Sequence, residues 1–394
     1  MRQLGGKINL VICQKSKIDD WKAHFLENYS YTVIDLTVPN AIDTFTSRFE
    51  SVVGVINYEL IFRRKAMLQM RFDTVMLDES SMIQNDTAKR TKAVLKLKTD
   101  NVILLSGTPT GGKYENLYSQ MRLLGWNISK TQYYSEFIET KKINMGGFKI
   151  PVVTGYKNVG RLKRKMRQFG CDFLKTDEVF ELPAQTFTDI RVSVSKEYKK
   201  FQKTKLIVVN ARNGCEFHDE SDFYGQDVTP RVELVGDTAL TQMFYERQLC
   251  GAYSADKLNA FADLLESTNE RLIVFYNFNA ELEQLKAICK RPVSEVNGTT
   301  KDLTAYEKDA DSVTLIQYQA GAMGLNLQKA NKIVYFTPPL SSELYEQSKK
   351  RIHRIGQERP CFYYRLICKN SIEGRIYETL EKRQDFTEKL FAKG

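Results

Sequence analysis

The sequence has no Cys-x-x-C pair, although it contains 7 cysteines. Cysteines that stand singly exclude a disulfide framework and a zinc ribbon, so we expect reduced intracellular thiols. The nearest approach to a metal-binding pair is Cys215 with His218, and no second pair stands close to it. We therefore expect structural or solvent-exposed roles for these two side chains.

Long apolar runs, repeats and low-complexity tracts are missing as well. No apolar run approaches the roughly 20 residues that a transmembrane helix needs. The N-terminus lacks the cleavage-site pattern of a secreted protein. No internal repeat with a period of about 20 to 50 residues is present. A soluble protein of the cytoplasm is expected.

The composition of the 394 residues is that of a soluble globular protein, with 42% hydrophobic and 27% charged residues. At roughly 150 residues per domain, this length predicts two or three domains. Lysine and arginine together number 58 against 48 acidic residues, which gives a formal charge of +10. This moderate excess fits a polyanionic partner such as nucleic acid.

Two blocks of the chain alternate short apolar runs with helical stretches, a pattern that predicts an α/β fold with parallel sheets. In the first block we expect strands at residues 10–13, 32–36, 52–57, 74–77 and 101–106. In the second block, which begins near Ser254, we expect strands at residues 271–276, 313–317, 332–336 and 362–368. The domains are accordingly expected at 1–113, 114–253 and 254–394.

The middle segment, 114–253, is predicted to be basic and mostly helical, with a strand at 186–194. Its most basic stretch contains Arg161, Lys163, Arg164, Lys165 and Arg167. No residue of this segment has a role that the sequence assigns.

The first candidate catalytic residues are the adjacent carboxylates Asp78 and Glu79, which end an apolar strand. In open α/β sheets, ligands bind at the carboxyl ends of the strands. There, one carboxylate can hold Mg²⁺ while the next orients a water for attack on a γ-phosphate. The alternative for this pair alone is a solvated turn.

Two further sequence strings are candidates for the same site as the Asp78–Glu79 pair. One is the strand 101–105 followed by Ser106-Gly107-Thr108-Pro109, for which the alternative is a simple turn. The other is Gln347-x-x-x-Arg351-x-His353-Arg354-Ile355-Gly356-Gln357. Arg351 and Arg354 are three residues apart and are expected to share a helical face. An arginine pair offers bidentate donors to phosphate oxygens, although a solvated basic helix is the alternative.

Together these strings resemble motifs of superfamily-two helicases. Asp78-Glu79-Ser80-Ser81, Ser106-Gly107-Thr108-Pro109, Gly321-x-x-Gly324-Leu325-Asn326-Leu327 and the final string follow the order of motifs II, III, V and VI. The ending His-Arg-Ile-Gly-Gln is typical of the Swi/Snf branch, and Asp-Glu-Ser-Ser resembles the variant in its phage members. Smaller matches to this branch are Trp21, Asn57-Tyr58-Glu59, Asp256-Lys257-Leu258 and Phe275-Tyr276-Asn277-Phe278.

The resemblance implies two RecA-like lobes with helical insertions between them, ATP and Mg²⁺ bound between the lobes, and movement on duplex DNA. By matching position, Asp78 would hold the metal and Glu79 would orient the attacking water. Arg351 and Arg354 would reach the γ-phosphate. The remaining residues implied are Gly324 and Gln347 for ATP, and Lys15, Ser106 and Thr108 for DNA binding or coupling.

One part of the family pattern is missing, namely the phosphate-binding loop Gly-x-Gly-Lys-Thr before motif Ia. Gly5-Gly6-Lys7 precedes a strand, whereas a phosphate loop must follow one. The stretch Gly107–Lys113 matches the spacing, but Tyr114 stands where a Ser or Thr must bind Mg²⁺, and Pro109 removes an amide donor. We prefer motif III for this stretch.

We therefore expect a first lobe that is incomplete at its N-terminus, in a fragment, a split gene product or one piece of a two-chain enzyme. The strand that bears Asp78 is expected to have an open edge, and a P-loop-bearing chain is an expected partner. The alternatives are a non-hydrolysing DNA-binding remnant or regulatory subunit, and an RNA helicase. The latter predicts Ala-Asp after Asp78-Glu79, which the sequence does not have. If the protein is phage-encoded, the host cytoplasm is its expected location.

Overall fold

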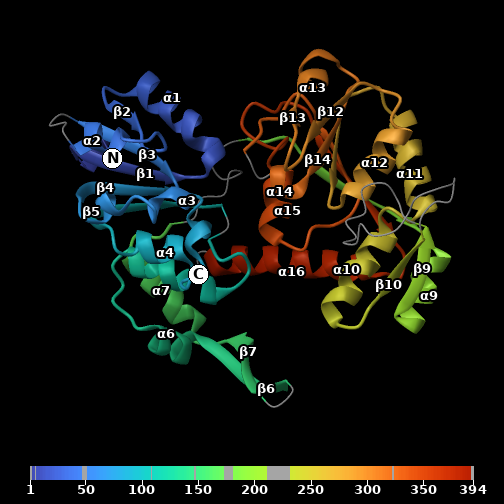
Figure 1. The fold of residues 1–394 in the computed structure, drawn as a ribbon, viewed down its shortest axis with the longest axis horizontal. Coiled ribbons are helices and arrows are strands. Elements are labelled where there is room, and N and C mark those ends of the chain that lie inside the picture. Colours follow the sequence, from blue (N-terminus) through green and yellow to red (C-terminus); the bar gives the residue numbers. More distant parts are fainter. Residues whose placement is uncertain are drawn as a thin grey trace, which may run out of the picture. The chain divides into compact units, whose positions relative to one another are not determined.

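The structure is a computed structural model that describes residues 2–4, 6–46, 51–107, 109–145, 148–172, 181–210, 231–321 and 324–391. Thr108, Gly5, Cys215 and His218 of the sequence analysis lie outside these residues. The chain forms two compact units, unit 1 with residues 1–173 and 383–394, and unit 2 with residues 174–382 (Figure 1). Within the described residues, no helix combines the length and apolar character needed to cross a bilayer.

Unit 1 contains a five-stranded sheet in the order β2-β3-β1-β4-β5. All its strands are parallel, as near-continuous apolar runs predict. The strands are β1 (Ile8–Cys13), β2 (Thr32–Asp35), β3 (Val52–Asn57), β4 (Arg71–Asp78) and β5 (Lys98–Leu105). The helices around them are α1 (Ile18–Asn28), α2 (Ala41–Thr46), α3 (Tyr58–Ile61) and α4 (Lys89–Val94). The expected strands of the first block are thus confirmed.

The open edge of this sheet is not where the sequence analysis expected it. The strand that bears Asp78, β4, pairs with β1 on one side and with β5 on the other. The expectation of an open edge at β4 is therefore wrong, because the strand that follows it in the chain occupies that side. Among the described residues β5 has a free edge, and its side chains are all half-buried or exposed.

The remainder of unit 1 packs around Trp126 and Tyr133, both buried. It contains a 3₁₀ helix at Tyr114–Leu117, α5 (Tyr118–Leu123), α6 (Lys130–Phe137), β6 (Ile138–Met145), β7 (Phe148–Tyr156) and α7 (Val159–Gln168). The antiparallel hairpin of β6 and β7 departs from the expected helical character, since its β-branched residues favour strands. In Figure 1 this hairpin extends from the α6–α7 part of the unit.

Unit 2 contains a seven-stranded sheet in the order β13-β12-β14-β11-β15-β16-β8, parallel except between β12 and β13. The strands are β8 (Gln185–Val192), β11 (Leu272–Tyr276), β12 (Val293–Val296), β13 (Lys301–Asp302), β14 (Val313–Gln317), β15 (Lys332–Tyr335) and β16 (Cys361–Cys368). The expected α/β class with parallel sheets is confirmed. Because β8 pairs with β16 along its whole length, part of the middle segment belongs to this sheet. The three-part domain division stays a prediction.

The helices of unit 2 lie on the sheet and beside a second hairpin. They are α9 (Lys196–Thr204), α10 (Ala239–Cys250), α11 (Ala255–Glu266), α12 (Asn279–Ile288), α13 (Thr304–Lys308), α14 (Tyr318–Gly321), α15 (Ser342–Lys349) and the first part of α16 (Ile372–Phe391), whose residues from 383 onward belong to unit 1. The hairpin of β9 (Leu206–Asn210) and β10 (Arg231–Val235) packs against α9 through buried Ile207, Val209 and Leu234. Here too the expected helical character gives way to strands.

Candidate functional site

The predicted residues of unit 1 gather at the carboxyl edge of its sheet. In the strand register, Ile12 lies beside Leu77, and Asp78 lies beside Leu105. Lys15 follows β1 by two residues and Ser106 directly follows β5. The structure therefore brings Lys15, the Asp78–Glu79 pair and Ser106 to one edge, as parallel strands require. Thr108 lies outside the described residues.

Trp21 of α1 orients the carboxylate of Asp78. Its indole Nε1 donates a hydrogen bond to Asp78 Oδ2 at 2.9 Å. The indole in turn packs against the ring of Phe25, with centroids 5.8 Å apart. An N–H bond to an ionised carboxylate is a charge-assisted hydrogen bond, which fixes the direction of that carboxylate. The sequence analysis quoted Trp21 as a motif match without giving it a role.

Tyr58 fastens the backbone on which both acids stand. The phenol is fully buried, and its hydroxyl donates to the carbonyl oxygens of Asp78 at 2.8 Å and Glu79 at 3.3 Å. Burial, with the nearby charge of Asp78, raises the pKa of Tyr58 far above its usual range, so the hydroxyl keeps its proton. Glu79 has φ 52° and ψ 60°, a left-handed conformation that is uncommon for residues other than glycine. Tyr58 thus holds the strained turn that directs the Glu79 side chain.

Gln120 of α5 links the Asp-Glu-Ser-Ser loop to the loop after β5. Its Oε1 accepts from the Ser80 hydroxyl at 2.9 Å, and its Nε2 donates to Pro109 O at 2.7 Å. All three residues are buried or half-buried, which makes these bonds costly to break. Gln120 was missed because no sequence pattern marks it.

Two backbone amides at the end of the Gly107–Lys113 stretch donate within the stretch itself. The Gly112 amide donates to Thr110 Oγ1 at 3.1 Å, and the Lys113 amide donates to Thr110 O at 2.9 Å. A phosphate loop instead directs such amides at its ligand and opens an α-helix. Here a 3₁₀ helix begins at Tyr114. The preference for motif III over a phosphate loop stays a prediction.

In unit 2, the two arginines do not share a helical face. Helix α15 ends at Lys349, and a non-helical loop carries Arg351 and Arg354. The Leu327 amide donates to Arg351 O at 3.1 Å, which draws this backbone away from the helical path. The expectation based on their spacing is therefore wrong. Arg351 is only 9% exposed, whereas Arg354 is half-buried.

Gln357 and His353 hold the loop in place. Gln357 is buried and donates through Nε2 to the carbonyl oxygens of Gln328 and Ala330 at 3.0 and 2.9 Å. His353 Nε2 lies 3.0 Å from Pro183 O. These residues therefore fix the loop around Arg354, and a structural role accounts for two positions of the His-Arg-Ile-Gly-Gln string.

The other two predicted ATP residues also lie in unit 2. Gly324 has φ 68°, which glycine adopts without the cost that other residues incur. Gln347 is half-buried on α15 and donates to Glu343 Oε1 at 3.4 Å.

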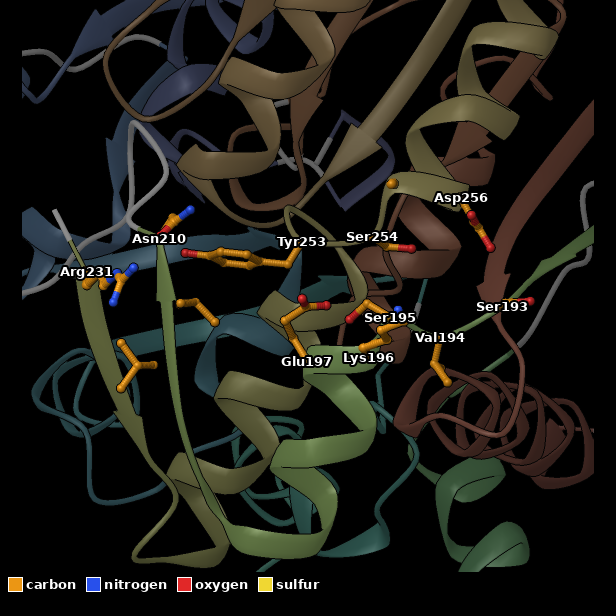
Figure 2. Close-up of a pocket in the computed structure, with 13 residues that line it drawn as sticks. Ser193, Val194, Ser195, Lys196, Glu197, Asn210, Arg231, Tyr253, Ser254 and Asp256 are labelled. Carbon is orange, nitrogen blue, oxygen red and sulfur yellow. The ribbon is translucent and has the colours of Figure 1, made fainter. Parts of the chain in front are cut away.

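A cavity of about 910 Å³ in unit 2 contains none of the predicted site residues. The starts of α9 and α11 and the end of β9 line it, and the Tyr253 ring points toward Asn210 (Figure 2). Its charged side chains are of both signs, including Arg231 and Asp256. Of the motif matches, the cavity therefore includes Asp256 of Asp256-Lys257-Leu258, but none of the residues proposed to bind ATP, metal or DNA.

Comparison with known families identifies the class of this protein. The family model of the SNF2-related domain matches residues 4–254, and that of the helicase conserved C-terminal domain matches residues 256–356. The chain belongs to the SNF2-related family, which confirms the Swi/Snf resemblance of its motifs.

Individual relatives are distant. The chain is 24% identical over 97% of its length to an uncharacterized ATP-dependent helicase of Mycoplasma genitalium. It is 23% identical over 82% of its length to the DNA repair and recombination protein RAD26 of Saccharomyces cerevisiae. The chain spans 37% and 32% of these two proteins. The structure titled Sulfolobus solfataricus SWI2/SNF2 ATPase core in complex with dsDNA has a TM-score of 0.39 and 18% identity, over 97% of this chain and 82% of that one.

Proposed function

We propose that this chain is the core of an ATP-dependent DNA translocase that hydrolyses ATP with Mg²⁺ once a P-loop is supplied. The observation that carries this proposal is the Asp78–Glu79 pair, which Trp21 and Tyr58 orient at the carboxyl edge of a parallel sheet. Such an edge is the usual ligand site of open α/β sheets. We place the protein in the cytoplasm.

The donor chemistry at this edge fits a magnesium nucleotide. Asp78 offers a carboxylate whose direction is already fixed by the 2.9 Å bond from Trp21, and Mg²⁺ prefers oxygen ligands. The ion, when bound, neutralises charge on the phosphates. Glu79 accepts a hydrogen bond from the attacking water and orients it. Gly324 and Gln347 contact the nucleotide.

Arg354 is the better candidate for the residue that contacts the γ-phosphate. Its side chain is half-buried. Among the described residues, no acidic side chain forms an ion pair with it. Arg351 is more buried, and its Nη1 lies 3.5 Å from Leu325 O, which assigns it to holding the motif V backbone. Arg354→Ala should therefore lower DNA-stimulated turnover by about 10³- to 10⁵-fold, with Arg351→Ala affecting folding as well.

The P-loop is proposed to come from a segment that adds a strand beside β5. Residues 102–105 of β5 are all large and apolar, yet Leu105 is 40% exposed. A free edge of this kind accepts another strand through its unpaired backbone groups. The segment can be joined to this chain or belong to a partner. Without it we expect no ATP turnover, because phosphoryl transfer depends on P-loop positioning.

DNA is the proposed track. The charge of +10 favours a polyanion, and no base-reading module is visible in the sequence. Lys15, which is exposed at the carboxyl edge, and Ser106 and Thr108 are proposed to bind DNA or couple it to ATP. Binding should consequently show little sequence preference and weaken steeply with salt.

The test is ATP turnover by the chain joined to a P-loop segment of a family member, with duplex DNA, single-stranded DNA or duplex RNA added. We expect duplex DNA to stimulate turnover most, and Glu79→Gln or Arg354→Ala to remove it. Stimulation by RNA alone would favour an RNA helicase. DNA binding without any turnover would favour a non-hydrolysing DNA-binding subunit.

A further inference from the structure

Helix α7 carries a high density of positive charge, and none of its basic residues belongs to the proposed catalytic site. Its inward face is fixed by Leu162, which is 0% exposed, and Met166, which is 4% exposed, both packed in the core around Trp126. The remaining positions include Arg161, Lys163, Arg164, Lys165 and Arg167, and the helix contains no acidic residue. The helix is thus strongly amphipathic, with one apolar side and one cationic side.

The cations are ordered on the helix surface. Arg161, Arg164 and Arg167 are exposed, and each is three residues from the next, so they form a row opposite the buried face. Lys163 and Lys165 are half-buried and stand on either flank of the row. At about 1.5 Å of rise per residue, the row is about 9 Å long. A row of this length can contact neighbouring phosphates of one strand.

Local carboxylates neutralise little of this charge. Glu136 Oε2 lies 3.3 Å from Arg161 Nη1. For Arg164, Lys165 and Arg167, the described part of the chain provides no recorded ion pair. Like charges three or four residues apart destabilise a helix. The sequence therefore keeps a repulsive arrangement that an external anion would relieve.

The chemistry of the row fits a phosphate backbone better than an acidic protein surface. None of the large apolar side chains that the described residues expose belongs to α7. Protein interfaces centre on buried aromatic and apolar anchors, which this face lacks. Arginine predominates in the exposed row, and its planar fork matches phosphate oxygens. The hairpin that precedes the helix adds the exposed Lys141 and Lys142.

We propose that the outward face of α7 is an additional nucleic-acid contact that grips the phosphate backbone of duplex DNA. It is separate from the strand-end residues Lys15, Ser106 and Thr108. This inference rests on the proposed function, because DNA is the partner in both. It gives part of the basic middle segment a role that the motifs do not provide.

The experiment measures the affinity of the 394-residue chain for a mixed-sequence duplex over a range of salt concentrations. The test variant is Arg164→Gln/Lys165→Gln/Arg167→Gln, since glutamine preserves helix propensity. The matched control is Lys199→Gln/Lys200→Gln/Lys203→Gln on α9, where all three lysines are exposed and the same charge is lost. Each phosphate contact contributes about 0.9 to the slope of log affinity against log salt. We expect the α7 variant to lose about 2 to 3 from this slope and the control to lose less than about 1.

The outcomes test the α7 contact and the proposed function separately. Equal losses in both variants would mean that net charge alone matters, and would overturn the assignment to α7. An unchanged slope in the α7 variant, while the wild type binds DNA, would overturn it and leave the proposed function standing. The binding of polyglutamate to the wild type and to the α7 variant is measured in parallel. If the α7 variant loses polyglutamate binding but keeps DNA binding, the face binds an acidic polypeptide instead. A wild type that binds no DNA would overturn both, and circular dichroism checks that each variant is folded.

Discussion

The ion pair between Lys257 and Glu373 should be among the most sensitive positions of unit 2. Both residues are 0% exposed, and Lys257 Nζ lies 2.6 and 2.7 Å from the two oxygens of Glu373. The pair ties α11 to the start of α16. Lys257→Met keeps the length and apolar stem of the side chain but removes the ammonium. We expect it to lower the free energy of unfolding by about 3–5 kcal/mol, the usual cost of leaving one charge of a buried pair.

The magnitude follows from what remains in the core. Without the ammonium, the buried Glu373 carboxylate retains its hydrogen bond from the Cys368 amide at 2.9 Å and the weaker influence of the Arg247 charge, but loses its direct counter-ion. The double variant Lys257→Met/Glu373→Leu removes both charges and should recover most of the loss. Urea unfolding of the wild type, both single variants and the double variant gives the coupling energy.

A surface pair provides the control. Lys329 and Glu307 are ion-paired, but their side chains are 51% and 53% exposed. Lys329→Met should therefore change the free energy of unfolding by less than about 1 kcal/mol. If Lys257→Met is as mild as this control, or if the double variant is no more stable than the single one, the reasoning is refuted.

Other predictions concern pH and the support of the carboxylate pair. Burial raises the pKa of Glu281 from 4.5 to about 7, against the opposing charge of Lys257. The folded state therefore binds the proton more tightly, and stability should fall by about 3 kcal/mol as pH rises from about 4.5 to 7. In the Glu281→Gln variant this fall should be absent. If the free energy of unfolding depends on pH in the same way in the wild type and in Glu281→Gln, the prediction is contradicted. Tyr58→Phe removes the 2.8 Å hydrogen bond from the phenol to Asp78 O, while Glu79 O keeps the bond from the Met82 amide at 2.9 Å, and the change should cost about 1–3 kcal/mol in thermal unfolding. A cost below about 0.5 kcal/mol would show that the phenol does not hold the turn.

Strand positions and the shared edge of the catalytic candidates could be predicted from sequence. Near-continuous apolar runs identify buried parallel strands, and parallel strands must end on one side. Asp78 and Ser106 therefore fall at the same edge without any knowledge of side-chain contacts. The open edge was misplaced because strand order depends on pairing between segments, which apolar runs do not specify.

The contacts that orient the site could not be predicted. Trp21 and Asp78 are 57 residues apart, and Tyr58 lies 20 residues before Asp78. Such bonds depend on how α1 and α3 pack on the sheet, and no local pattern encodes them. The loop of Arg351 shows the same limit, since a hydrogen bond from Leu327 overrides the helical spacing of the two arginines.

The central claim is that Glu79 and its neighbours form a working ATPase site only with a P-loop. The direct measurement is ATP turnover by the 394-residue chain with Mg²⁺ and duplex DNA, with and without an added P-loop segment, beside a Glu79→Gln control. The account predicts no turnover by the chain alone, and DNA-dependent turnover that the control lacks when the segment is present. Robust turnover by the chain alone that disappears in Glu79→Gln would contradict the account, because the Gly107–Lys113 stretch would then have to hold the phosphates.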